Sequence, residues 1–233
     1  MQGVPSFIQD VLHLLYPHLC IGCGSDLLEP QETLCLYCNN ELPKTAFASL
    51  ENNPVEKILL GRLPIEAAHS EYYFSKGQLI QHMIHALKYK GNKAVGQFLG
   101  AQIGSTLLQS SRFKHIDLIL PLPMFAAKEY KRGYNQATII AQGIAAQMNK
   151  TCQNNLLYRT HATQTQTTKD RSTRWENVRK SFGIKDPHSV KGKNILLVDD
   201  VITTGATLEA CGQLIADIPQ TKLYIVTAAF ASH

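Results

Sequence analysis

Apolar positions along the chain follow two different spacings. Short runs of apolar residues are typical of strands, and apolar residues three and four positions apart are typical of amphipathic helices. The strand-like segments are 67–74, 116–120, 193–199 and 222–229, with a shorter candidate at 155–158. The helix-like segments are 79–87, 95–107, 137–148 and 207–216. Because strands and helices alternate, we predict an α/β fold with a parallel sheet covered by helices on both faces.

The first 65 residues do not follow this alternation. Apolar residues at helical spacing between Phe7 and Leu15 predict a short amphipathic helix. The stretch before the α/β pattern is rich in turn-forming residues, with room for one short helix at 55–60. We therefore predict an N-terminal module over 1–45, a linker over 46–65 and the α/β domain over 66–233.

Four of the six cysteines form two closely spaced pairs, Cys20 with Cys23 and Cys35 with Cys38. Each Cys-x2-Cys turn directs two sulfur atoms to one centre, and two such turns supply the four-thiolate shell that Zn²⁺ prefers. Two disulfides or an iron–sulfur cluster are the alternatives. A reducing compartment argues against disulfides, and the lack of electron-transfer features argues against a cluster. We predict a structural zinc ribbon within residues 1–45, because cysteine fills all four metal positions.

The composition is that of an ordinary globular protein, with 44% of the 233 residues hydrophobic and 8% aromatic. No apolar run approaches the roughly 20 residues that span a membrane. The N-terminus carries Asp10 and no basic cluster, unlike a signal peptide. We therefore expect a cytoplasmic protein without membrane insertion. The net charge of +5 does not establish nucleic-acid binding, but six basic and two acidic residues concentrate in the polar stretch 159–180.

The segment 195–207 carries the strongest chemical pattern in the chain. A buried-strand sequence leads into Asp199 and Asp200, a turn of small and hydroxyl residues follows, and a helix-like segment begins after it. A strand, tight loop and helix N-terminus bind phosphate through backbone N–H groups and the helix dipole. Each part alone is common in α/β proteins and an N-terminal Thr is often only a cap. Their order together predicts a site for a ligand with phosphate, ribose hydroxyls and bound Mg²⁺.

Three further clusters fall on loops of the predicted fold. Residues 121–123 read Pro-Leu-Pro and lead to a basic stretch at 128–136. The loop 159–177 is rich in hydroxyl and amide side chains and is too long for a simple connection. An earlier cluster, Leu-Lys-Tyr-Lys-Gly, occupies 87–91. Ligands of parallel sheets bind at the carboxyl ends of the strands, which is where Asp199 and Asp200 are expected.

The order of these motifs resembles known families. The segment 195–207 resembles the phosphoribosyl-pyrophosphate (PRPP) signature of type I phosphoribosyltransferases. Together with the cysteine pairs and the three clusters, it makes nearly the whole chain similar to the competence-associated ComF family, whose relatives are linked to DNA uptake and to gluconate use. The chain departs from that family at Lys169, where an apolar residue is often found.

The resemblance implies a type I phosphoribosyltransferase fold and transfer of phosphoribosyl from PRPP, with Mg²⁺, to an unidentified acceptor. It implies that Asp199 and Asp200 contact the ribose hydroxyls, directly or through Mg²⁺. The residues implied to hold the 5′-phosphate are Thr203, Thr204, Gly205, Ala206 and Thr207. Those implied to lie near pyrophosphate are Lys131 and Arg132, with Lys169, Arg171 and Arg174 on a lid over 160–174. Asp199, Asp200, Arg171 and Arg174 are thus the predicted catalytic residues, and no residue stands out as a general base.

A second interpretation is a binding module for DNA transformation with a regulatory or vestigial PRPP site. There the zinc ribbon and the basic loop contact single-stranded DNA or a competence helicase. Trp175 in that loop is a candidate for stacking on bases, although a loop anchor packed on the domain is the favoured role. A glutamine amidotransferase is disfavoured, because the chain carries no N-terminal Cys nucleophile.

Overall fold

The computed structural model describes residues 18–26, 28–29, 32–160 and 181–231, and the chain divides into two compact units, 1–42 and 43–233. In the first unit, a turn over 20–25 is closed by the Cys20 N–H, which donates to the Ser25 carbonyl at 2.8 Å. Helix α2 (Leu36–Asn40) begins directly after Cys35. The helix predicted between Phe7 and Leu15 lies outside the described residues.

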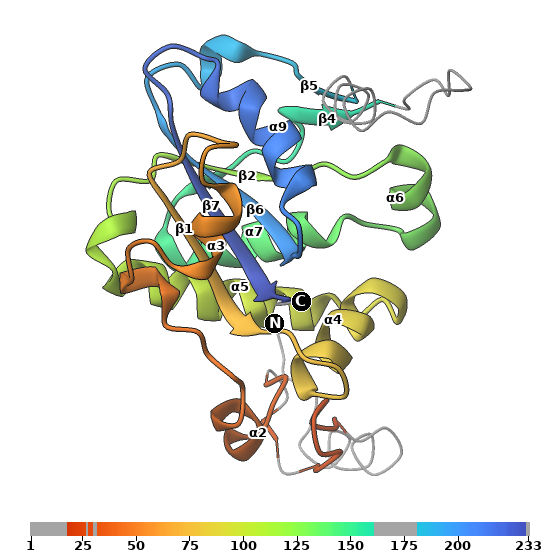
Figure 1. The fold of residues 1–233 in the computed structure, drawn as a ribbon. Coiled ribbons are helices and arrows are strands. Elements are labelled where there is room, and N and C mark those ends of the chain that lie inside the picture. The colour runs from red at the N-terminus through yellow and green to blue at the C-terminus, as the bar shows by residue number, and fades with distance from the viewer. Residues whose placement is uncertain (1–17, 27, 30–31, 161–180, 232–233) are drawn as a thin grey trace, which may run out of the picture. The chain divides into compact units, whose positions relative to one another are not determined.

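The second unit is built on a five-stranded parallel sheet, which confirms the predicted fold class (Figure 1). The strand order is β1 (Ala67–Tyr73), β7 (Lys222–Phe230), β6 (Asn194–Ile202), β2 (Leu118–Pro121) and β3 (Thr151–Cys152). A separate antiparallel pair consists of β4 (Leu157–Arg159) and β5 (Phe182–Ile184). The run from Ile195 to Val198 is fully buried, as expected for a central parallel strand covered on both faces.

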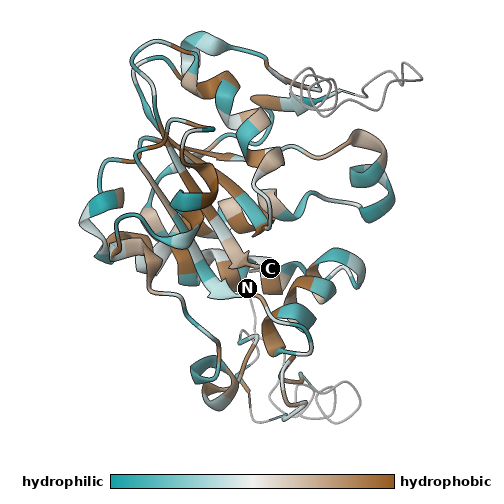
Figure 2. Cartoon of the chain, in the orientation of Figure 1, coloured by the Kyte–Doolittle hydropathy of each residue, from teal (hydrophilic) through white to brown (hydrophobic). Residues whose placement is uncertain are grey.

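Helices cover both faces of this sheet (Figure 1). One face carries α5 (Lys93–Gln109) and α7 (Gln136–Met148), and the other carries α3 (Pro54–Leu59) and α9 (Ala206–Ala216). Two more helices, α4 (Leu79–Tyr89) and α6 (Ala126–Arg132), project on the same side as the β4–β5 pair, at the right of Figure 1. The remaining elements are the 3-10 turns η1 (Phe47–Ser49), η2 (Ser111–Phe113) and η3 (Pro187–Ser189). Figure 2 shows the central strands as mostly hydrophobic.

Strand β6 is longer than the sequence pattern indicated. The predicted strand ends at residue 199, but pairing with β7 continues through Val201 opposite Ala229 and Ile202 opposite Phe230. Asp199 and Asp200 therefore lie near the end of β6, where the strand is still paired with β7. Among the described residues, no helix combines the length and the apolar character needed to cross a lipid bilayer.

The segment 46–65, for which we predicted a linker, contains η1 and α3 and packs along edge strand β1. The fully buried Asn53 is the centre of this contact, because its side-chain amide donates to the Ala68 carbonyl at 2.8 Å and its Oδ1 accepts the Val55 N–H at 3.0 Å. The first bond joins the segment to β1, and the second caps α3. Edge strands expose unpaired backbone groups, so this segment also protects the sheet from pairing with another chain.

Helices α5 and α7 approach closely at two glycines. A Cβ placed on Gly100 would lie 2.3 Å from the Ile140 carbonyl oxygen, and one placed on Gly143 would lie 2.7 Å from the Gln97 carbonyl oxygen. We expect Gly100→Ala to force the helices apart and to lower the free energy of unfolding by about 1–3 kcal/mol. Urea denaturation measures this loss, with Ala94→Ser at an exposed position of α5 as the control. An unchanged midpoint for Gly100→Ala would contradict the close contact.

Candidate functional site

The four predicted metal-binding cysteines come together in the N-terminal unit. The Sγ atoms of Cys20, Cys23, Cys35 and Cys38 all lie within 4.8 Å of one another. The Cys35 N–H points at Cys20 Sγ at 3.4 Å, and the Cys38 N–H points at Cys35 Sγ at 3.5 Å. Such N–H groups stabilise thiolates. The cluster is therefore a four-sulfur site suited to a metal ion.

Two thiols of this cluster, Cys20 and Cys38, have pKa values shifted in opposite directions. Burial alone would raise the pKa of Cys20, but N–H groups of Cys23, Cys35 and Gly22 donate to its sulfur and lower the pKa to about 6. A thiolate is the form that binds metals. Cys38 shows the opposite shift, because burial and contacts with the other thiols raise its pKa to about 12.

The second site lies where β6 ends and α9 begins. The chain turns through residues 203–205, and Gly205 adopts φ +72°, a conformation that side chains disfavour. A small hollow of about 50 Å³ is lined by Asp199 and by residues 201–208. The structure thus brings together the predicted phosphate-binding residues Thr203, Thr204, Gly205, Ala206 and Thr207. The N-terminus of α9 adds the positive end of the helix dipole to this hollow, which favours an anion.

The two predicted acids lie beside the hollow and have different partners. The Asp200 N–H donates to Asp199 Oδ1 at 2.8 Å, and Asp200 Oδ2 forms an ion pair with Lys88 Nζ at 2.8 Å. Lys88 comes from the end of α4, 112 positions earlier in the chain. The sequence pattern identifies residues 87–91 as a cluster but assigns Lys88 no role, since spacing alone does not place it against Asp200.

The surroundings of Asp199 shift its ionisation. Burial raises the pKa of Asp199 to about 8, and the negative charge of Asp200 acts in the same direction. Lys88 and Arg159 oppose the shift. A buried carboxyl with neighbouring cations is typical of a functional site.

Arg159 is the second cation that the sequence had not assigned. Its guanidinium lies 3.9 Å from the ring centroid of Phe125 and 4.6 Å from that of Phe182. The two rings hold it in place by cation–π contacts. It also lines a cavity of about 390 Å³ between the loop after β2 and strand β4, with Pro123, Met124 and Asn155. The only sequence feature that pointed to Arg159 was its place in the basic stretch 159–180.

Of the other predicted cations, the structure places Lys131 and Arg132 at the end of α6. Arg132 hydrogen-bonds to Gln136, and its guanidinium lies 5.4 Å from the ring centroid of Tyr89, next to Lys88 in α4. The structure thus brings Arg132 to the end of α4, and Lys131 is exposed. Lys169, Arg171, Arg174 and Trp175 lie outside the described residues.

The chain is similar in sequence to a known domain family and to several named proteins. Residues 131–231 match the model of the phosphoribosyl transferase domain family. The chain is 25% identical over 225 residues to Competence protein F of Haemophilus influenzae, covering 92% of this chain and 91% of that protein. It is 26% identical over 208 residues to Competence protein ComFC of Bacillus subtilis, covering 87% of this chain and 82% of that protein.

Shorter matches involve other proteins. DNA utilization protein YhgH of Escherichia coli (strain K12) is 27% identical over 136 residues, which are 57% of this chain and 59% of that protein. The match thus spans less than two thirds of the YhgH length. A glutamine PRPP amidotransferase from B. subtilis, solved with ADP and GMP, is similar in structure with a TM-score of 0.44 and 16% identity, over 62% of this chain and 30% of that chain.

Proposed function

Since the chain belongs to the ComF family and carries a phosphoribosyl transferase domain, we propose that it binds PRPP at the end of β6 and transfers phosphoribosyl to an acceptor. One observation carries the proposal. The anion-binding start of α9 and the acids Asp199 and Asp200 border one another on a single rigid strand and loop. A phosphate and a ribose in one ligand would occupy both.

The proposed roles follow from this arrangement. Backbone N–H groups over 203–207, with the threonine hydroxyls, hold the 5′-phosphate. Asp199 and Asp200 face the ribose hydroxyls. The same pair suits Mg²⁺, which proteins bind through one or two carboxylates together with substrate oxygens. When bound there, Mg²⁺ neutralises charge on the pyrophosphate group.

Transfer is a substitution at C1 of the ribose. The bond from C1 to the pyrophosphate oxygen breaks with its electron pair on the oxygen, and a lone pair of the acceptor forms the new bond to C1. Positive charge develops on the ribose, and negative charge develops on the leaving group. Asp199 and Asp200 stabilise the positive charge on the ribose. We propose that five cations stabilise the negative charge on the departing pyrophosphate: Lys88, Arg159, Lys169, Arg171 and Arg174.

The four-cysteine cluster is proposed to hold structural Zn²⁺. Four sulfur donors close a tetrahedral shell and leave no position for a substrate. Cysteines that hold zinc as thiolates persist in a reducing compartment, so we propose a cytoplasmic location.

A link to DNA uptake is the biological part of the proposal. It is supported by relatives whose names refer to competence and to DNA utilization. The acceptor is then sought among nucleobases, amines and nucleic acids.

Isothermal titration of the whole protein with PRPP tests binding, with and without Mg²⁺. We expect saturable binding that requires Mg²⁺, and release of pyrophosphate when a true acceptor is added. No heat of binding in the presence of Mg²⁺ would overturn the proposal. Binding without pyrophosphate release from any acceptor class would favour a PRPP-sensing role.

A second candidate function is single-stranded DNA binding, favoured by one surface of the α/β unit. We define the α4–α6 surface by exposed residues at the end of α4, at the start of α5 and in α6, namely Tyr89, Lys90, Lys93, Tyr130 and Lys131. Tyr89 is 68% exposed and Tyr130 is 92% exposed, although aromatic side chains are usually buried. Exposed aromatics among cations are typical of surfaces on which bases stack. A competence helicase is the alternative partner for this surface.

Fluorescence anisotropy with labelled single-stranded DNA tests this candidate. Phosphate contacts predict an affinity for DNA that falls steeply as the salt concentration rises. The double variant Tyr89→Ala with Tyr130→Ala should bind single-stranded DNA more weakly. A flat salt dependence would contradict DNA binding by this surface. Loss of binding by these variants with PRPP affinity intact would separate the two functions.

A further inference from the structure

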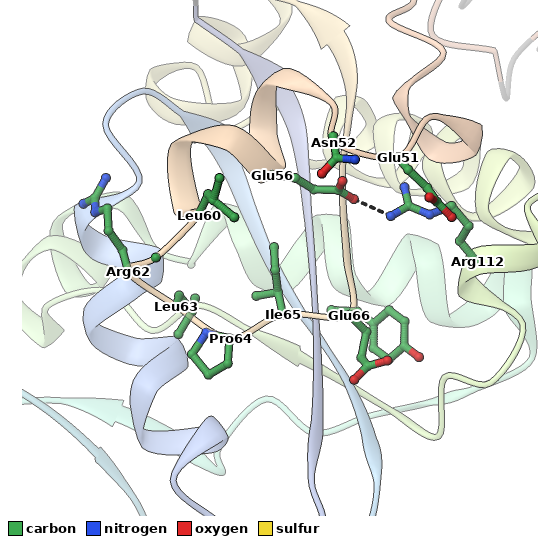
Figure 3. Close-up of a pocket in the computed structure, with 12 residues that line it drawn as sticks. Glu51, Asn52, Glu56, Leu60, Arg62, Leu63, Pro64, Ile65, Glu66 and Arg112 are labelled. Carbon is green, nitrogen blue, oxygen red and sulfur yellow. Dashed lines mark hydrogen bonds and ion pairs between the residues drawn. The ribbon is translucent and has the colours of Figure 1, made fainter.

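Arg62 contacts the phosphate-binding loop from outside the predicted site. It follows α3 and lines a cavity of about 740 Å³ on the α3 side of the sheet (Figure 3). Its Nη1 donates to the Thr204 carbonyl at 2.9 Å and to the Ile58 carbonyl at 3.0 Å. Its Nη2 forms an ion pair with Glu209. One guanidinium thus joins α3, the loop and α9.

The bond to Thr204 fixes the direction of a peptide group in the loop. In a trans peptide the C=O and the following N–H point in opposite directions. When Arg62 holds the Thr204 oxygen on its side, the Gly205 N–H is directed away from Arg62. Backbone N–H groups of this loop are the proposed phosphate donors, so their orientation determines affinity.

Packing against α3 holds the same peptide. A Cβ on Gly205 would lie 2.9 Å from Ile58 Cγ2 and 3.0 Å from Leu59 Cδ2, so α3 touches the loop backbone directly. Arg62 and these two side chains therefore restrict the loop from one side.

The ion pair with Glu209 has an electrostatic consequence. Glu209 lies in the first turn of α9, and its side chain is 8% exposed. A carboxylate there interacts well with the helix dipole but repels a bound phosphate. Arg62 balances that charge without entering the hollow.

We infer that Arg62 is a positioning residue, which orients the 203–207 loop and neutralises Glu209 so that the 5′-phosphate of PRPP can bind. This inference rests on the proposed function, because it concerns the same ligand. It assigns a role to a residue that the sequence pattern placed in a linker.

The test compares Arg62→Met with Arg112→Met. Arg112 lines the same cavity and is bonded in a similar way, to the Leu50 carbonyl at 2.8 Å and to Glu56 at 2.6 Å (Figure 3). These partners precede and begin α3 and are not part of the 203–207 loop. Three probes are titrated calorimetrically with Mg²⁺: PRPP, ribose 5-phosphate and pyrophosphate. Only the first two carry the 5′-phosphate.

We expect Arg62→Met to weaken PRPP and ribose 5-phosphate by about tenfold and to leave pyrophosphate unchanged. Arg62→Met with Glu209→Gln should recover part of the loss, because the repelling charge is gone. Arg112→Met should bind all three probes like the wild type. An equal loss of affinity for PRPP and ribose 5-phosphate in Arg112→Met would indicate general destabilisation. So would a loss of pyrophosphate affinity in Arg62→Met, and either result would overturn the inference.

Amide hydrogen exchange provides a readout that needs no ligand. We expect faster exchange over residues 203–209 in Arg62→Met than in Arg112→Met. If the wild type binds PRPP and Arg62→Met changes neither exchange nor affinity, Arg62 has no positioning role. If amide exchange over residues 203–209 is faster in Arg62→Met but the wild type does not bind PRPP, the proposed function fails. The inference about phosphate binding then fails with it.

Discussion

Removal of metal from the four-cysteine cluster is expected to unfold the described residues of 18–42 while those of 43–231 stay folded. The described part of the first unit buries only four hydrophobic residues, Cys20, Leu34, Cys38 and Leu42, and two of these are the proposed ligands. Such a core is too small to fold alone, so metal binding supplies the stability. Structural zinc in zinc-finger peptides contributes about 10–16 kcal/mol at pH 7. The second unit has its own large core around the parallel sheet.

Hydrogen exchange measured by mass spectrometry, with metal content measured in the same sample, tests this expectation. After chelation, or in Cys23→Ser, amides of residues 18–42 should exchange rapidly and about one equivalent of zinc should be lost. Cys152→Ser is the matched control, because Cys152 lies outside the cluster. Unchanged exchange over 18–42 in the metal-free protein would refute a structural metal site.

Replacement of Asp199 and Asp200 by Asn is expected to reduce affinity for PRPP with Mg²⁺ by at least about a hundredfold. Each substitution removes a carboxyl oxygen that accepts from a ribose hydroxyl or binds the metal ion. Bound Mg²⁺ favours the ionised form of both carboxyls, and hydrogen bonds to charged groups contribute about 1.5–3 kcal/mol. Asp217→Asn is the control, because Asp217 caps the opposite end of α9. Retention of full affinity in the double variant would place the ligand elsewhere.

The stability of Asp199→Asn is expected to depend less on pH than the stability of the wild type. Burial raises the pKa of Asp199 to about 8, so between about pH 4 and pH 8 the folded protein holds a proton that the unfolded chain has lost. Stability from this group therefore falls as pH rises through that window. Thermal unfolding without Mg²⁺ should show Asp199→Asn less sensitive to pH than the wild type, and at least as stable at pH 8. If the variant were less stable than the wild type at pH 8, the pKa of Asp199 would not be raised in the folded protein.

The sheet could be predicted because its signals are local. The run from Ile195 to Val198 has no polar residue, and in a chain with alternating helices such a run becomes a buried parallel strand. The loop over residues 203–207 was predictable for the same reason, since Gly205 and its neighbours follow that strand directly, and its binding of phosphate stays a prediction. Likewise, the spacing of Cys20 with Cys23 and of Cys35 with Cys38 anticipates the cluster.

The partners of the loop were not predictable from spacing. Lys88 meets Asp200 from a different helix, and Arg62 meets Thr204 across 142 positions. Such contacts depend on how helices pack on the sheet, which no local pattern records. The segment around Asn53 looked like a linker because its polar residues resemble a turn, yet the fold buries Asn53 by satisfying its amide with backbone groups.

A crystal structure of the whole protein grown with PRPP and Mg²⁺ tests the central claim most directly. We predict the 5′-phosphate against the backbone of residues 203–207, the ribose hydroxyls facing Asp199 and Asp200, and pyrophosphate toward Lys88 and Arg159. PRPP bound at another place, or a loop that stays empty at saturating PRPP, would contradict the account.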